Sequence, residues 1–258
     1  MNVVRTVCAA RTSLLNRVAP FSSLKYNQNL NRNVAFGQPR LFSTMGNGRS
    51  HMSVNSLGRL RAEETALFVC DVQERFRSVI HGFPAVVDVA QRMVQAAPEL
   101  GLAGIVVTEQ YPKALGSTVS EVADVLGDGV YKKVVAKTDF SMLVPDVKEI
   151  LEKNGSLGQV KNVLLLGVET HVCILQTTID LVDMGYEVHI LVDGVSSQRI
   201  GDRAAALHRL AAMYPGKVHI ASSEMTMFQM MVNTSHPGFK AVSKICKGER
   251  DYEPLPPM

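Results

Sequence analysis

Residues 163–173 read Val163-Leu164-Leu165-Leu166-Gly167-Val168-Glu169-Thr170-His171-Val172-Cys173, an apolar run that leads into a helical pattern. The apolar run lacks polar alternation, which is typical of a parallel strand covered on both faces. Thr170 suits the position just before a helix, because its hydroxyl can accept a hydrogen bond from a backbone N–H two or three residues later. A buried strand followed at once by a helix is the repeating unit of an α/β domain.

Similar apolar runs recur along the chain with helical patterns between them. Further buried strands are expected at 66–70, 104–108 and 188–192, and the less apolar stretches 131–135 and 217–220 are expected to add one strand each. Asp193-Gly194, directly after one of these runs, is expected to organise a turn. Alternating strands and helices predict an α/β domain with a mainly parallel sheet, and in such sheets ligand sites form beyond the carboxyl ends of the strands.

Charge divides the chain into two unlike parts. Met1 to Ala62 holds eight Arg and one Lys with no Asp or Glu, which leaves 18 basic and 24 acidic residues from Glu63 onward. The acidic balance of the second part argues against nucleic-acid binding, which needs a clustered basic face. No run of about 18 apolar residues is present to cross a membrane. We expect a lead at 1–61, one domain at 62–247 and a tail at 248–258.

The basic, acid-free lead has the composition of an organelle transit peptide. Arg40-Leu41-Phe42-Ser43 resembles a mitochondrial processing site, so mitochondrial targeting is the expectation. A disordered basic tail is the simpler interpretation. Initiation at Met45 or Met52 would instead leave a cytoplasmic protein.

Two strand ends carry candidate catalytic groups. Asp71 follows the run at 66–70, where a half-desolvated carboxylate can serve as a base. Cys173 falls in the first turn of the expected helix, where the helix dipole favours a thiolate and free backbone N–H groups can hold an oxyanion. The alternatives are a structural hydrogen-bond acceptor for Asp71 and a small buried apolar residue for Cys173.

Other residues give weaker signals. Lys137 follows a short apolar stretch that could bring it to the same edge, although local sequence alone favours a solvated surface lysine. His171 is too close in sequence to face Cys173 across one helical turn, so we expect it to cap or support the site. Cys70 is expected in the core. The seven His and four Cys show no metal-ligand spacing, and there is no glycine-rich phosphate loop, so neither metal nor cofactor is expected.

Three segments together resemble the isochorismatase-like cysteine hydrolases. They are Leu67 to Phe76 around Asp71, Ala136 to Ser141 around Lys137, and Gly167 to Cys173. The segment Thr108 to Gly116 is similar to the domain-containing branch of that family. It holds no His, so the zinc site of the nicotinamidase branch is not expected.

The resemblance implies a three-layer α/β/α sandwich with a mainly parallel six-stranded sheet. It implies Cys173 as nucleophile, Asp71 as general base and Lys137 as electrostatic partner, with backbone N–H groups of Glu169 and Cys173 holding the oxyanion. It also implies a cis peptide between Val168 and Glu169, and a homo-oligomer.

The function expected from these residues is hydrolysis of a small amide-type C–N bond through a Cys173 thioester. One alternative is a catalytically weak scaffold or regulator that keeps the hydrolase fold, and another is a vinyl-ether isochorismatase. The expected partner is a small-molecule substrate, with no nucleic acid and no membrane. Position alone suggests the pocket residues, which are Gln73, Phe76, Glu109, Gln110 and Phe140.

Overall fold

The computed structural model describes residues 59–127, 129–250, 252–256 and 258. The expected transit peptide and the initiation alternatives at Met45 and Met52 lie outside these residues. Six strands form the sheet: β1 (Thr65–Cys70), β2 (Gly104–Gln110), β3 (Tyr131–Lys137), β4 (Asn162–Val168), β5 (Glu187–Ser196) and β6 (Val218–Ala221).

Helices and short helical turns fill the connections between the strands. The longer helices are α1 (Phe83–Leu100), α4 (Pro145–Leu151), α5 (Leu175–Asp183), α6 (Ile200–Met213), α7 (Ser223–Met231) and α8 (Phe239–Cys246). The shorter ones are η2 (Ala62–Glu64), η3 (Glu74–Phe76), α2 (Pro112–Leu115), α3 (Ser120–Ala123) and η4 (Thr170–Ile174). Each expected strand is present, within a few residues of its expected limits.

All strand pairs are parallel, and the order in the sheet is β3-β2-β1-β4-β5-β6. The chain therefore builds outward from β1 to β3, returns to β4 beside β1, and builds outward the other way. The point where the direction reverses, between β1 and β4, is where open α/β sheets form their ligand sites. Every residue of β1 is buried, as expected for the strand next to that point.

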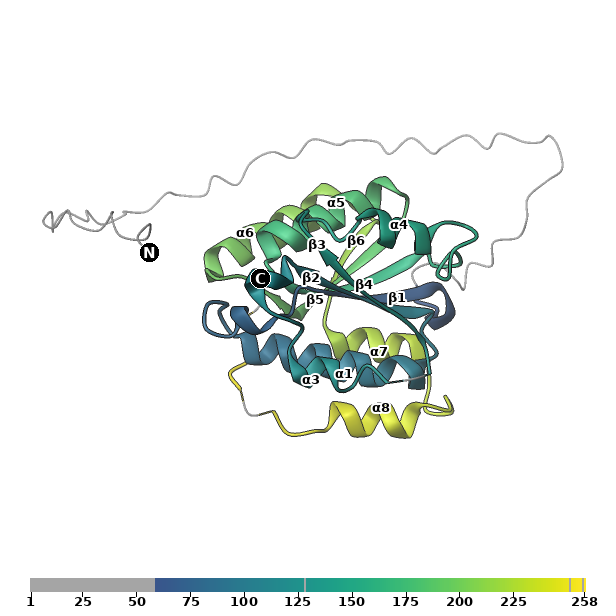
Figure 1. Ribbon diagram of the computed structural model, residues 1–258. Coiled ribbons are helices and arrows are strands. Elements are labelled where there is room, and N and C mark those ends of the chain that lie inside the picture. The colour runs from purple at the N-terminus through teal and green to yellow at the C-terminus, as the bar shows by residue number, and fades with distance from the viewer. Residues whose placement is uncertain (1–58, 128, 251, 257) are drawn as a thin grey trace, which may run out of the picture. The chain divides into compact units, whose positions relative to one another are not determined.

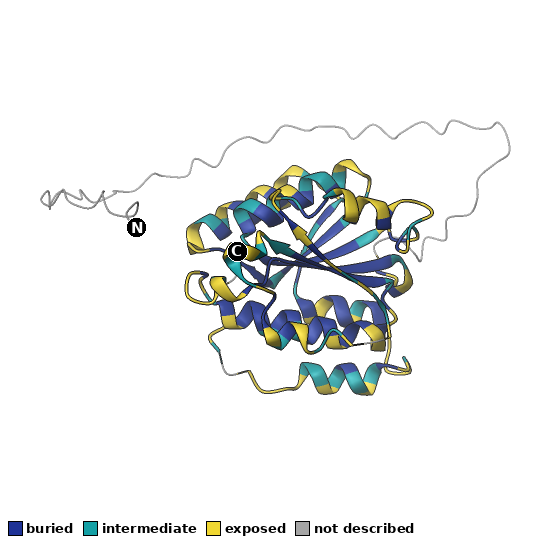
Figure 2. Ribbon diagram, in the orientation of Figure 1, coloured by how far each residue is buried: buried dark blue, intermediate teal, exposed yellow. Residues whose placement is uncertain are grey.

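Helices cover both faces of the sheet, which makes the three-layer sandwich that the sequence predicts. Figure 1 shows α4, α5 and α6 on one face and α1, α3 and α7 on the other, with α8 outside α1 and α7. Each face has its own apolar cluster. Figure 2 shows the buried residues concentrated in the strands and on the helix faces turned toward them. Both faces of a parallel sheet must be covered, which is why the inner strands are mainly apolar, whereas the edge strand β3 has several exposed residues.

The expected turn at Asp193-Gly194 is wrong, because β5 continues through both residues to Ser196. A side chain at Gly194 would lie 2.7 Å from Cγ1 of Val89, so glycine lets α1 pack directly on the strand. The Asp193 carboxylate accepts hydrogen bonds from the backbone N and Oγ of Ser223 at 2.8 and 2.6 Å. Asp193 therefore holds the start of α7 instead of making a turn.

The segment after residue 247 is in contact with the domain. Arg92 of α1 donates to the carbonyls of Gly248 and Glu249 at 3.2 and 3.0 Å, and Arg203 of α6 donates to the carbonyl of Pro256 at 2.9 Å. The expected tail thus packs on the domain at these residues. No helix within the described part of the chain is both long and apolar enough to span a membrane.

His189, in β5, is an unusual core residue. Its side chain is buried, and its Nε2 has no hydrogen-bond partner among the described residues. Burial, with a smaller effect of the neighbouring His219, lowers the pKa of His189 to about 4. The ring is therefore neutral in the folded protein at pH values where an unfolded chain would protonate it.

We expect this histidine to make the fold sensitive to mild acid. Between about pH 6.5 and 4 the unfolded chain binds one proton more than the folded chain, so stability falls as pH falls through that window, by up to about 3 kcal/mol. Urea unfolding of wild type and His189→Leu in metal-free buffer, at pH 7 and pH 4.5, measures this. The wild type should lose roughly 2 kcal/mol more than the variant, and equal losses would contradict the assignment.

Candidate active site

The three residues singled out from the sequence meet at the carboxyl edge of the sheet. Asp71 follows β1, Lys137 ends β3, and Cys173 lies in η4 just after β4. All three are nearly inaccessible, at 1%, 4% and 6% exposure. Asp71 has a left-handed backbone with φ of 55°, a conformation that Asp and Asn tolerate better than most residues.

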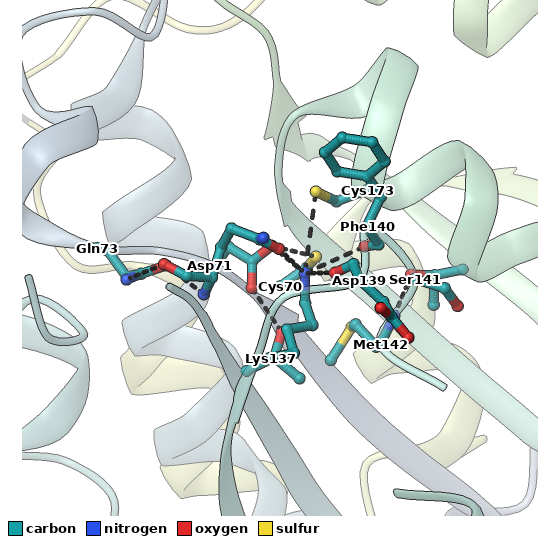
Figure 3. A network of polar contacts seen from close by, with 12 residues as sticks. Cys70, Asp71, Gln73, Lys137, Asp139, Phe140, Ser141, Met142 and Cys173 are labelled. Atoms are coloured by element: carbon teal, nitrogen blue, oxygen red, sulfur yellow. Dashed lines mark hydrogen bonds and ion pairs between the residues drawn. The ribbon is translucent and has the colours of Figure 1, made fainter. Parts of the chain in front are cut away.

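The Asp71 carboxylate is held by three donors, of which Lys137 and Cys70 are labelled in Figure 3. Lys137 Nζ lies 2.7 Å from Oδ2, Thr108 Oγ1 donates to Oδ1 at 2.7 Å, and Cys70 Sγ donates to Oδ2 at 3.5 Å. Thr108 reaches the carboxylate because it pairs with Cys70 in the register of β1 and β2. A buried carboxylate with this many donors has one orientation, and its Oδ2 is held toward the sulfur atoms.

Lys137 reaches across β2 to the same point. Its ammonium also donates to Gln110 Oε1 at 2.7 Å and to the carbonyls of Asp139 and Phe140, both at 3.1 Å. Cys173 Sγ is 3.9 Å away from Nζ. Burial alone would lower the pKa of Lys137, but attraction to Cys70, Asp71 and Cys173 outweighs it and raises the pKa above its ordinary value. Lys137 is thus a fixed positive charge between a carboxylate and a thiol.

A second thiol accompanies Cys173. Reactive atoms of Cys70, Asp71 and Cys173 all lie within 4.8 Å of one another. Burial raises the pKa of the Cys70 thiol well above its ordinary value, and contact with Cys173 and the charge of Asp71 add to the effect. Cys70 therefore stays protonated, while Cys173 is the thiol that faces the Lys137 ammonium.

The segment that presents Cys173 depends on a close backbone approach. Gly167 has φ of +124°, and a Cβ there would lie 2.1 Å from the carbonyl oxygen of Cys70. Only glycine allows β4 to meet β1 in this way. The peptide between Val168 and Glu169 is cis, which confirms the expectation drawn from the resemblance.

The expected capping role of Thr170 is wrong. The residue before η4 is Glu169, whose side chain makes no capping hydrogen bond, and the Thr170 hydroxyl has no partner among the described residues. Instead, the Thr170 N–H donates to Ser197 Oγ at 3.1 Å, and the Glu169 carbonyl accepts from the N–H groups of Val172 and Ile174. η4 is a wide π-type turn, so its hydrogen bonds do not follow the pattern from which the cap was inferred.

His171 lies two residues before Cys173, and its ring contacts other side chains. Its Nδ1 is 3.1 Å from Ser197 Oγ and 3.5 Å from Glu169 Oε2, and its Nε2 is 4.0 Å from Asp202. These contacts fit the supporting role expected from its spacing to Cys173.

The suggested pocket residues separate into different environments. Gln73 is buried and hydrogen-bonds the backbone of Gln110 and Gly116, while Glu109 accepts from the N–H and hydroxyl of Thr118. These two side chains tie loops together.

The other three suggested pocket residues differ in their contact with the Lys137 ammonium. Gln110 contacts Lys137 directly and also donates to the Thr138 carbonyl at 2.8 Å. Phe140 offers its carbonyl to Lys137 and has a side chain that is 52% exposed. Phe76 packs against the apolar cluster on the α1 face.

Two neighbours of the site were not identified from the sequence as part of it. Cys70 was assigned to the core, which is correct for its burial, but its sulfur also contacts Asp71. Thr108 ends an apolar run at a strand end, and this is the signal by which it could have been found. The cluster of Cys70, Asp71 and Cys173 has metal-ligand atom types, yet the Lys137 ammonium already lies at hydrogen-bond distance from Asp71 as its cation.

Comparison with known proteins agrees with this geometry. Residues 65–223 match the isochorismatase domain. The chain belongs to the isochorismatase family. The secreted isochorismatase effector Isc1 of Phytophthora sojae is 46% identical over 191 residues, covering 74% of this chain and 88% of that protein.

Two further proteins are similar to this chain over most of their own length. Isochorismatase domain-containing protein 2 of Xenopus laevis is 42% identical over 193 residues, covering 75% of this chain and 88% of that protein. The solved structure named MAR1 ribonuclease from Caenorhabditis elegans is 37% identical with a TM-score of 0.66, covering 78% of this chain and all of that one. The six-stranded parallel sheet is thus the fold of the isochorismatase family.

We expect Lys137→Met to destabilise this isochorismatase domain by about 3–5 kcal/mol, because it leaves the Asp71 carboxylate buried without its cation. The double variant Asp71→Asn/Lys137→Met should recover part of that loss, because no unpaired charge remains. Urea unfolding of the wild type, both single variants and the double variant measures the coupling. A Lys137→Met variant within about 1 kcal/mol of wild type would contradict a tightly coupled pair.

Proposed function

We propose that this chain is a hydrolase that cleaves a small amide-type C–N bond, with Cys173 as nucleophile, Asp71 as general base and Lys137 as electrostatic partner. The observation that carries the proposal is the position of the Lys137 ammonium, 2.7 Å from Asp71 Oδ2 and 3.9 Å from Cys173 Sγ. A fixed cation at this distance stabilises a thiolate and leaves the carboxylate oriented to exchange a proton with it.

Acylation uses these three groups in turn. Asp71 takes the proton of the Cys173 thiol, and the sulfur forms a bond to the carbonyl carbon while the carbonyl π electrons move onto oxygen. The tetrahedral intermediate then collapses and the C–N bond breaks. The amine leaves with the proton that Asp71 returns, and an acyl thioester remains on Cys173.

Hydrolysis of the thioester restores the enzyme. Asp71 removes a proton from water as the water oxygen bonds to the acyl carbon. The C–S bond then breaks, the carboxylic acid leaves, and the thiolate takes back the proton held by Asp71. The net reaction is amide plus water to acid plus amine, with Lys137 charged throughout because its pKa is raised.

The oxyanion of both intermediates needs hydrogen-bond donors. The Thr170 N–H already donates to Ser197 Oγ, and the N–H groups of Val172 and Ile174 already donate to the Glu169 carbonyl. We assign the oxyanion to the N–H groups of Glu169 and Cys173, which lie in the same segment as the nucleophile. Backbone donors in a desolvated site contribute strongly to acyl transfer.

Burial of the site favours a small substrate. Cys173 is 6% exposed, so the reacting carbonyl must enter a narrow approach. The Caenorhabditis elegans relative is named a ribonuclease. In this chain the acidic excess from Glu63 onward opposes a polyanionic substrate, so we propose a small neutral or cationic amide.

We expect Cys173→Ala to lower kcat/KM for a cleaved amide by at least about 10³-fold, since the other thiol at the site, Cys70, is kept protonated by its burial and is a poor nucleophile. A screen of small amides, carbamoyl compounds, isochorismate and single-stranded RNA against wild type and variant measures this. Cys246→Ala is the matched control, because Cys246 is a partly buried thiol far in sequence from the site residues.

Intact-mass analysis after a brief exposure to iodoacetamide gives an independent readout. One label on Cys173 that appears before any on Cys70 or Cys246 supports an activated nucleophile. Equal slow labelling of the three domain thiols, Cys70, Cys173 and Cys246, or hydrolysis that survives Cys173→Ala, would overturn the proposal. Cleavage of isochorismate alone by both proteins would identify a vinyl-ether hydrolase instead.

A further inference from the structure

A second cluster of polar side chains lies on β5 and β6, away from the carboxyl edge that carries Asp71. Glu187 begins β5, His189 follows two residues later on the same face, and His219 lies on β6. The parallel register pairs His189 directly with His219. Their rings stack with centroids 4.5 Å apart and planes 18° from parallel.

Each of the two imidazoles has a ring nitrogen without a hydrogen-bond partner among the described residues. In His189 and in His219 this nitrogen is the buried Nε2. Glu187 Oε2 is 3.6 Å from His219 Nε2, just beyond hydrogen-bond distance. His189 as a whole is only 7% exposed. Leaving a buried ring nitrogen unpaired costs about 1–3 kcal/mol, so two together call for an explanation.

A cavity of about 670 Å³ lies next to the cluster, and Glu187, His189 and His219 are part of its lining. One ligand atom from each of the three lies within 4.8 Å of the others. Tetrahedral coordination at Zn–N distances near 2.1 Å needs ligand atoms roughly 3.4 Å apart. The side chain of Glu187 is 43% exposed and that of His219 is 37% exposed. Both side chains therefore have room to rotate and bring their ligand atoms to the spacing that tetrahedral coordination needs.

We propose that Glu187, His189 and His219 bind a divalent transition-metal ion, Zn²⁺ in the first instance, between β5 and the edge strand β6. Two imidazoles and one carboxylate are a common ligand set for such ions, with the remaining position open to water. The site is separate from Cys173 and plays no part in the thioester chemistry proposed above. Its role is to join the edge strand to the sheet.

The charge around the cluster selects the kind of cation. Arg59, Arg61 and Lys161 also line the cavity, and Lys161 is paired with Glu64 at 2.5 Å. These basic groups disfavour Mg²⁺ and Ca²⁺, which bind through oxygen ligands and charge alone. A transition-metal ion held by imidazole nitrogens is less affected by these basic groups, because its bonds to nitrogen do not depend on charge alone.

The test is Zn²⁺ binding to the full-length chain after treatment with a chelator, followed by calorimetry and by thermal unfolding. Wild type should bind one Zn²⁺ per chain with a rise in Tm, while Mg²⁺ should give no rise. Glu187→Gln and His219→Gln should each weaken binding at least tenfold. His208→Gln, on the exposed side of α6, is the matched control and should bind as wild type does.

The thiol cluster is a competing place for Zn²⁺, and two measurements separate it. Cys173→Ser should leave Zn²⁺ affinity unchanged, and the Co²⁺ complex should lack the near-ultraviolet charge-transfer band of a thiolate ligand. No binding by wild type would overturn the proposal, as would loss of binding in Cys173→Ser. Unchanged binding in both Glu187→Gln and His219→Gln would also overturn it. Circular dichroism of the metal-free variants checks folding, and Glu187→Gln, which alters a half-exposed side chain, keeps the test valid if His219→Gln does not fold.

Discussion

The buried ion pair between Lys137 and Asp71 is the interaction on which the site depends. Taking both charges out of water is unfavourable by several kcal/mol each, and only close geometry with further hydrogen bonds offsets it. Here the 2.7 Å contact is supported by Thr108 on the acid side and by Gln110 and backbone carbonyls on the base side. The pair joins the ends of β1 and β3 across β2, so the edge of the sheet is held as one unit.

The parallel sheet explains why this pair can form at all. With strand order β3-β2-β1-β4, every carboxyl end in this half of the sheet lies at one edge. Loops tied by Gln73 and Glu109 keep the segment after β2 in place beside Lys137. Gly167 then lets β4 approach Cys70 closely, which delivers the turn that carries Cys173. The strand order and the loop hydrogen bonds together bury Asp71, Lys137 and Cys173 and hold them at fixed positions.

Different features of the chain were predictable to different degrees. Apolar runs identified the four inner strands, because burial on both faces leaves a clear compositional mark, while the edge strands β3 and β6 were expected from less apolar stretches. The end of β5 was misjudged, because Asp193-Gly194 has the composition of a turn while its actual roles are helix capping and close packing against Val89. The expected Thr170 cap is wrong for a related reason. The Thr170 N–H donates to Ser197, which is distant in sequence, and the turn that begins at Thr170 is wider than an ordinary helical turn.

The sequence by itself determined the fold class, the strand-end positions of Asp71 and Cys173, and through motif resemblance the family. Periodicity reports which residues are buried, and it is silent on which buried residues are neighbours. Only the tertiary structure decided that Lys137 reaches Asp71 across another strand, that Cys70 is a second thiol at the site, and that His189 and His219 stack in register. The Lys137–Asp71 contact joins residues 66 positions apart and the His189–His219 contact joins residues 30 positions apart, and strand order and register set both.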